Sequence, residues 1–162
     1  MASRARKLHI SDQVNRAVIL FKVGTYNHEI ARQTLSGLFT TQNGDYLTEV
    51  EQGSLILIKQ MKTKGDNYAT LDEGAETAVD MLNMEAMIKA IASYGTVVHE
   101  LKDLSKSFKE AKMAMDVGRI FYADKTVISY NRLGIGRLVY QLPRNLSRIF
   151  IREIFGEDES AA

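Results

Sequence analysis

The chain has no cysteine among its 162 residues. This absence excludes a disulfide framework and thiolate chemistry, and it fits a reducing compartment. Long apolar runs are also missing: no stretch approaches the roughly 18 residues that a membrane span needs, and none follows the basic residues near Met1 as in a signal peptide. These absences predict a cytoplasmic protein that is neither secreted nor embedded in a membrane.

A strong charge of either sign is absent too. Lys and Arg total 21 and Asp and Glu total 20, which gives a formal net charge of +1. A chain whose main task is to grip phosphates usually carries a larger basic excess or a concentrated basic face. Arg144, Arg148 and Arg152 do share one helical face, which we interpret as a solvated face or a domain contact. DNA binding by this chain alone is therefore not expected.

The composition is that of an ordinary globular domain, with 45% hydrophobic and 25% charged residues. The length suits one domain and is too short for two full ones. We therefore expect a linker or helix tail at 1–15, a single domain at 16–156 and a disordered tail at 157–162.

Strands and helices alternate in the first part of the chain. The segment 16–23 is almost continuously apolar and rich in β-branched residues, as in a strand covered on both faces. A helix is expected at 30–38. Two strands follow at 46–50 and 54–59, and they are close enough to form a hairpin in which Gly53 takes a positive φ.

The next elements complete a known pattern. After a polar loop at 62–70, Asp72 is expected to cap a helix that continues to Ile91, and the segment 94–98 forms the next strand. Strand, helix, hairpin, helix and strand make the βαββαβ core of a ferredoxin-like α+β fold, with helices on one face of the sheet.

The second part of the chain adds elements to that core. Apolar residues at helical spacing predict a helix from Leu104 to Met115, which Gly118 is expected to end in a left-handed conformation. A short strand at 126–130 follows. A pair of helices then lies on either side of Pro143, the single proline of the chain.

Two motifs in this part carry a family resemblance. The helix has a Ser-aromatic-x-x-Ala pattern, formed by Ser107, Phe108 and Ala111. The strand leads into an aromatic-x-x-Leu-Gly-x-x-Arg-Leu-Val pattern, formed by Tyr130, Leu133, Gly134, Arg137, Leu138 and Val139. Together they resemble the GGDEF-like domain of PucR/CdaR-type transcription regulators, which control purine catabolism and sugar diacid use.

The resemblance implies a nucleotide-cyclase type of fold, in which a helix, a strand and a C-terminal helical pair are added to the ferredoxin-like core. It also implies a regulatory domain that acts as a homodimer, senses a small effector, or does both. In this family a helix-turn-helix domain binds the DNA. It would begin after Gly156 and so is expected to be missing from this fragment.

Active GGDEF domains, to which this family is distantly related, carry two acidic residues in the hairpin turn and an Asp at the end of the first strand. These carboxylates hold magnesium beside a triphosphate. In this chain the turn reads Glu51, Gln52, Gly53, Ser54 and Leu55. Gly53 and Ser54 therefore replace the two acids, and Lys22, near the end of the first strand, would repel a cation. The sequence predicts no enzyme, no catalytic residue, no metal site and no cofactor.

A relic of the nucleotide pocket is the remaining candidate site. By position alone it would involve Lys22, Asn27 and Gln52, with a small-molecule effector as the ligand. The alternative from another class is a divergent nucleotide cyclase or nucleotide-binding enzyme that uses unrecognised residues. A free-standing interaction module is a third possibility.

Two further sets of residues have ordinary interpretations. The histidines, at positions 9, 28 and 99, have no convergent partners and are interpreted as surface or half-buried residues. Methionines recur every third residue at 81, 84 and 87. We interpret them as core filler in preference to a pliable binding surface.

Overall fold

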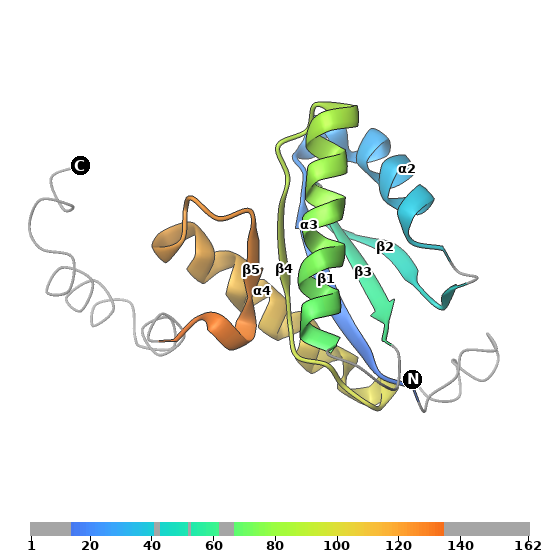
Figure 1. The fold of residues 1–162 in the computed structure, drawn as a ribbon, viewed down its shortest axis with the longest axis vertical. Helices are drawn as coiled ribbons and strands as arrows, with labels where there is room; N and C mark the ends of the chain where they lie inside the picture. Colours follow the sequence, from blue (N-terminus) through green and yellow to red (C-terminus); the bar gives the residue numbers. More distant parts are fainter. Residues whose placement is uncertain (1–13, 41–42, 52, 62–66, 135–162) are drawn as a thin grey trace, which may run out of the picture.

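The structure is a computed structural model that describes residues 14–40, 43–51, 53–61 and 67–134 (Figure 1). Its elements, in chain order, are β1 (Arg16–Lys22), η1 (Thr25–Asn27), α2 (His28–Leu38), β2 (Tyr46–Glu51), β3 (Ser54–Gln60), α3 (Asn67–Ala86), β4 (Ile91–Tyr94), η3 (Leu101–Asp103), α4 (Leu104–Phe121), β5 (Val127–Ser129) and η4 (Tyr130–Arg132). Most of the expected linker, the helical pair around Pro143 and the expected tail lie outside these described residues.

The five strands form one sheet in the order β2-β3-β1-β4-β5. β1 pairs antiparallel with both β3 and β4, and β2 pairs antiparallel with β3. The first four strands therefore have the ferredoxin-like arrangement that the sequence predicted. β5 extends the sheet by pairing in parallel with β4, and α4 makes the crossover that such a pairing requires.

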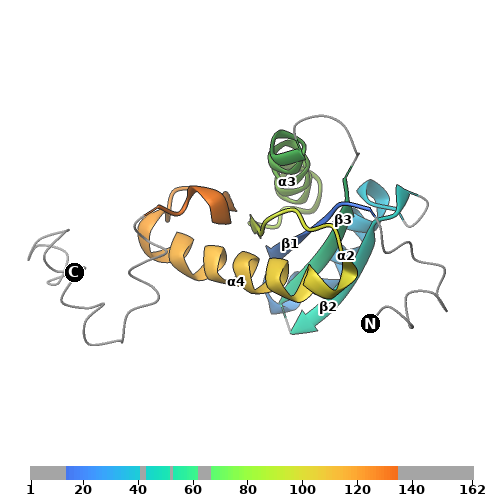
Figure 2. The ribbon, with the colours of Figure 1, turned by 90° about the horizontal axis from the view of Figure 1, so that it is seen from below.

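Both faces of the sheet are covered. Alternate residues of β1, including Ile19 and Phe21, lie in a core with α2 and α3. The residues between them, Val18 and Leu20, pack against α4 on the opposite face (Figure 2). This explains why β1 is apolar along almost its whole length. The expectation of helices on one face holds for α2 and α3, but not for α4.

The boundaries of α3 and β4 differ from the prediction. α3 begins at Asn67, so Asp72 lies inside the helix and is not its N-cap, and residues 67–70 are helical. The helix ends at Ala86 because Met87 takes the left-handed conformation, with φ 56, and the amide of Ile88 then donates to the Leu82 carbonyl at 2.9 Å. β4 consequently starts three residues earlier than expected, at Ile91.

The structure also differs from the prediction at the methionines of α3 and at the glycine of α4. Met84 and Met87 are 80% and 89% exposed, so they do not fill the core. Gly118 does not end α4, which continues to Phe121. A Cβ at Gly118 would lie 2.0 Å from Cδ1 of Ile128, so the glycine allows β5 to pack directly against the helix. No helix of the described residues is long and apolar enough to cross a membrane.

Candidate functional site

The tip of the β2–β3 hairpin lies against the end of β1, which is the position of the candidate site. Gly53 has a φ of +86, as expected for the hairpin turn. Its carbonyl accepts hydrogen bonds from the amides of Val23 at 2.9 Å and Gly24 at 3.2 Å. A Cβ on Gly53 would lie 3.2 Å from backbone atoms of Gly24 and Thr25. Backbone therefore occupies the space beside the tip.

The three pocket candidates are not brought together into a described pocket. Lys22 is exposed and pairs in the sheet with Ser54 and Ile91. Asn27 lies at the same end of the sheet, but its side-chain amide donates to the Val23 carbonyl at 3.3 Å. Gln52 lies outside the described residues. Asn27 therefore stabilises its own turn in this structure.

The acidic and histidine side chains near the hairpin do not converge. Glu51 is exposed at the end of β2. Glu49 lies 3.0 Å from Nε2 of the half-buried His28, which joins β2 to the start of α2. His99 is exposed and hydrogen bonds to Asn15. Among the described residues there is no group of three or more His, Cys, Asp or Glu side chains that could hold a metal ion.

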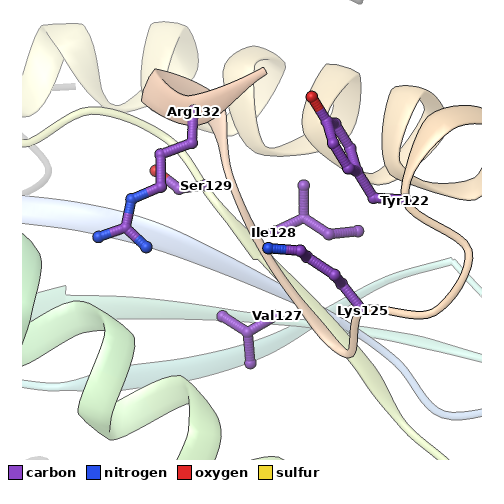
Figure 3. A pocket seen from close by; sticks show the side chains of 6 residues that line it. All are labelled: Tyr122, Lys125, Val127, Ile128, Ser129 and Arg132. Carbon is purple, nitrogen blue, oxygen red and sulfur yellow. The ribbon is translucent and has the colours of Figure 1, made fainter. Parts of the chain in front are cut away.

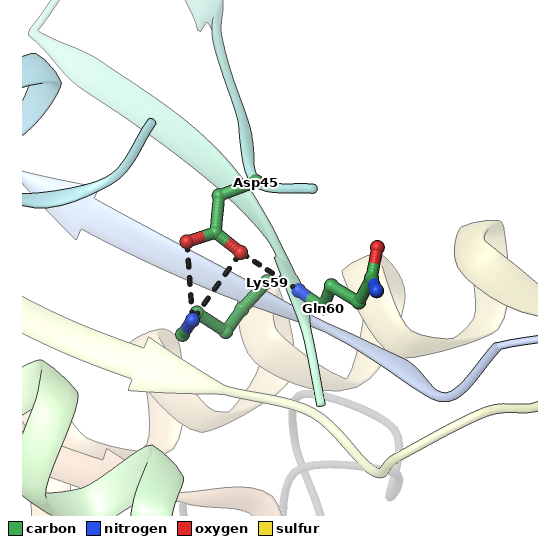
Figure 4. Close-up of polar contacts among 3 residues, drawn as sticks. All are labelled: Asp45, Lys59 and Gln60. Carbon is green, nitrogen blue, oxygen red and sulfur yellow. Dashed lines mark hydrogen bonds and ion pairs between the residues drawn. The ribbon is translucent and has the colours of Figure 1, made fainter. Parts of the chain in front are cut away.

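The most buried acid of the hairpin lies at its opposite end (Figure 4). Asp45 is 2% exposed, and its carboxylate accepts hydrogen bonds from Lys59 Nζ at 3.0 and 3.2 Å. The backbone amide of Gln60 donates to the same carboxylate at 3.0 Å. This cluster joins the residue before β2 to the end of β3. Every described hydrogen bond of the carboxylate is made within the hairpin, so the cluster fixes the hairpin.

A second polar cluster joins α3, β4 and η4. The hydroxyl of Tyr94, a residue that is 1% exposed, donates to Asp72 Oδ1. Arg132 Nη1 lies 2.8 Å from Asp72 Oδ2. Burial and the bond to Asp72 raise the pKa of Tyr94, while a hydrogen bond with Ser129 acts in the opposite direction. Sequence reasoning missed this cluster because the residues are far apart in the chain and Asp72 was interpreted as a helix cap.

The Ser-aromatic-x-x-Ala motif has a structural role. Ser107 is fully buried, accepts a hydrogen bond from the Val18 amide at 3.0 Å and donates to the Thr96 carbonyl at 2.9 Å. One turn later, the carbonyl of the buried Ala111 accepts a hydrogen bond from Ser93 at 2.6 Å. The motif therefore attaches α4 to the backbone of β1, to the backbone of the segment after β4, and to the Ser93 side chain of β4.

Comparison with known proteins agrees with this architecture. The model of the GGDEF-like domain family matches residues 1–117, a span that contains the hairpin, the first four strands and most of α4. The comparison with curated proteins gives no match. Since the family match covers well over half of the chain and the fold is of the expected α+β type, the chain belongs to the GGDEF-like domain family.

Proposed function

We propose that this GGDEF-like domain is a non-catalytic regulatory domain of a cytoplasmic helix-turn-helix transcription regulator. It transmits a signal by self-association, by binding a small effector, or by both. The observation that carries the proposal is the chemistry of the hairpin tip, where Gly53 and Ser54 replace the acids of active GGDEF domains.

The geometry of the tip supports the loss of catalysis. Gly53 cannot gain a carboxylate side chain without displacing the backbone of Gly24 and Thr25, since even a Cβ would lie 3.2 Å from both. The backbone amides of Val23 and Gly24, which would otherwise be available to a phosphate, donate to the Gly53 carbonyl instead. Lys22 adds positive charge where a magnesium ion would need negative charge.

The attachment of α4 to the sheet supports a role in signal transmission. Ser107 and Ala111 connect α4 to β1, β4 and the segment after β4 through three hydrogen bonds. A displacement of the central strand therefore moves α4 with it. Regulators that read paired DNA half-sites are two-fold symmetric, which is why self-association is included in the proposal.

The decisive experiment is calorimetric titration of the chain with GTP and magnesium, together with an assay for cyclic dinucleotides. We expect no metal-dependent binding and no product. Glu51→Gln provides the matched variant, because Glu51 is the one acid in the turn and a cryptic site would depend on it. Micromolar metal-dependent binding that Glu51→Gln abolishes would instead support a divergent nucleotide-binding enzyme.

Sedimentation and DNA binding test the rest of the proposal. We expect the chain to self-associate at high protein concentration, and a strict monomer would remove dimerisation from its role. We expect no sequence-specific DNA binding, because the near-neutral charge offers few phosphate contacts and any nonspecific affinity weakens as salt is raised. A sequence preference that survives at physiological salt and is lost in Arg148→Ala would contradict this.

A further inference from the structure

A small depression lies at the opposite edge of the sheet from the hairpin, between the turn after α4 and η4 (Figure 3). Its volume is about 50 Å³. It is lined by Tyr122, Lys125, Val127, Ile128, Ser129 and Arg132, none of which is acidic. A single water needs only ~10–15 Å³ of such space. The depression therefore has room for a small polyatomic ion, but not for a nucleoside.

Two cationic side chains reach into this depression from opposite sides of β5. Figure 3 shows the ammonium group of Lys125 beside β5, and the guanidinium group of Arg132 across the strand from it, extending toward α3. Lys125 is exposed, and within the described part of the chain it forms no ion pair. Two positive charges on one small concave surface make it attractive to an anion.

The other lining groups leave recognition to these two cations. The Tyr122 hydroxyl donates to the Leu133 carbonyl at 3.2 Å. Val127 and Ile128 supply an apolar wall. Arg132 pairs with Asp72 through Nη1 at 2.8 Å. A guanidinium group has five N–H donors, so it has the capacity to hold Asp72 and a second oxyanion together.

We infer that Lys125 and Arg132 form a binding site for a phosphate group. The planar donors of Arg132 suit two phosphate oxygens, and Lys125 supplies a point charge on the other side. The phosphate is either free inorganic phosphate or the phosphate group of a small metabolite. Because the site lies at β5, away from the hairpin tip, its occupancy depends neither on magnesium nor on the proposed regulatory function.

Binding at this site would change the surroundings of the buried cluster. A phosphate on Arg132 adds negative charge beside the ion pair of Arg132 with Asp72, and Asp72 is the acceptor of the Tyr94 hydroxyl. Phosphate binding at the exposed edge of the sheet would therefore affect a fully buried side chain of β4. The amide resonances of β4, β5 and η4 are expected to report the change.

The test is an NMR titration of the chain with sodium phosphate, with sodium chloride used to hold ionic strength constant. We expect saturable shifts in residues 122–133, with a dissociation constant of roughly millimolar order because exposed ion pairs are weak. Lys125→Gln should weaken binding at least about fivefold, the factor that ~1 kcal/mol represents. Lys89→Gln removes an exposed lysine of α3–β4 and should leave binding unchanged. Arg132→Gln provides a second variant for the same site.

The outcomes are distinguishable. Chemical shift changes that never saturate or that map outside residues 122–133 would overturn the inference, since they would reflect general ionic effects. An equal weakening of binding in Lys125→Gln and Lys89→Gln would overturn it for the same reason. A parallel titration with glycerol phosphate separates the two sources. Equal or tighter binding of the monoester identifies a metabolite phosphate, whereas binding of inorganic phosphate alone identifies the free ion, and the absence of both refutes the site.

Discussion

The substitution Gly95→Ala tests the closest approach between α4 and the sheet. Gly95 directly follows β4, and its amide donates to the Val18 carbonyl at 3.1 Å. A Cβ at this position would lie 2.1 Å from the backbone oxygen of Ser107 and 2.8 Å from its Oγ. Both distances are far below van der Waals contact, and the first atom belongs to the helix backbone. An alanine therefore forces α4 away from the sheet.

The cost follows from the contacts that this movement breaks. Ser107 Oγ accepts from the Val18 amide at 3.0 Å and donates to the Thr96 carbonyl at 2.9 Å. Each such bond contributes about 1 kcal/mol net, and the buried Val18 amide costs more when it is left without an acceptor. With some loss of packing between α4 and β1, we expect Gly95→Ala to lower the free energy of unfolding by about 3 kcal/mol. That is a large part of the ~5–15 kcal/mol typical of a domain.

Urea unfolding monitored by circular dichroism measures this loss. The matched control is Gly74→Ala, inside α3, where a Cβ would meet nothing within 4 Å. This control should stabilise the protein by roughly 0.5–1 kcal/mol, because alanine favours a helix over glycine. If Gly95→Ala costs less than about 1 kcal/mol, the reasoning fails, because α4 must then tolerate a shift without breaking the Ser107 bonds.

Four further substitutions test other parts of the structure. Gly53→Ala should destabilise the protein by roughly 1–2 kcal/mol, because φ is +86 and the new Cβ would crowd Gly24; an unchanged urea midpoint would contradict the geometry of the tip. Met87→Gly should stabilise by about 1 kcal/mol, since Met87 is 89% exposed at φ 56, and thermal unfolding shows the sign. Tyr94→Phe should lower the free energy of unfolding by about 1–2 kcal/mol. Arg132→Gln should lower it by under ~1 kcal/mol, because the Arg132 side chain is 70% exposed. Equal losses would refute the expectation that the Tyr94 hydroxyl contributes more than the Arg132 ion pair.

The core of the fold could be predicted from the sequence because its signals are local. The apolar run of β1 reflects a strand buried on both faces, and the short turn at Gly53 is sufficient to define the hairpin. The end of α3 could not be predicted in the same way. It depends on the left-handed conformation of Met87, a conformation that propensity assigns to glycine. Tertiary packing also overrode propensity at Gly118, which continues a helix because Ile128 requires the space.

Of the candidate site, only the position of the hairpin turn could be predicted. Gly53 and Ser54 can be placed at the turn directly from the sequence, since each position of a tight hairpin has a defined place. The polar clusters around Asp45 and Asp72 could not be foreseen. Their partners come from residues distant in the sequence, and the local sequence does not show whether an aspartate caps a helix, holds a hairpin or accepts from a buried tyrosine.

The folded unit extends beyond the segment that defines the family. The family match ends at Val117, inside α4. The buried side chains of Ala114 and Val117 nevertheless pack with Ile128 and Leu133, which follow the match. β5 also covers the edge of β4 through a parallel register of three residue pairs. An exposed edge strand beside an uncovered apolar helix face would favour aggregation. The elements up to η4 are therefore part of the same packed domain, and the proposed phosphate site lies in this extension and not in the part of the fold that the family shares.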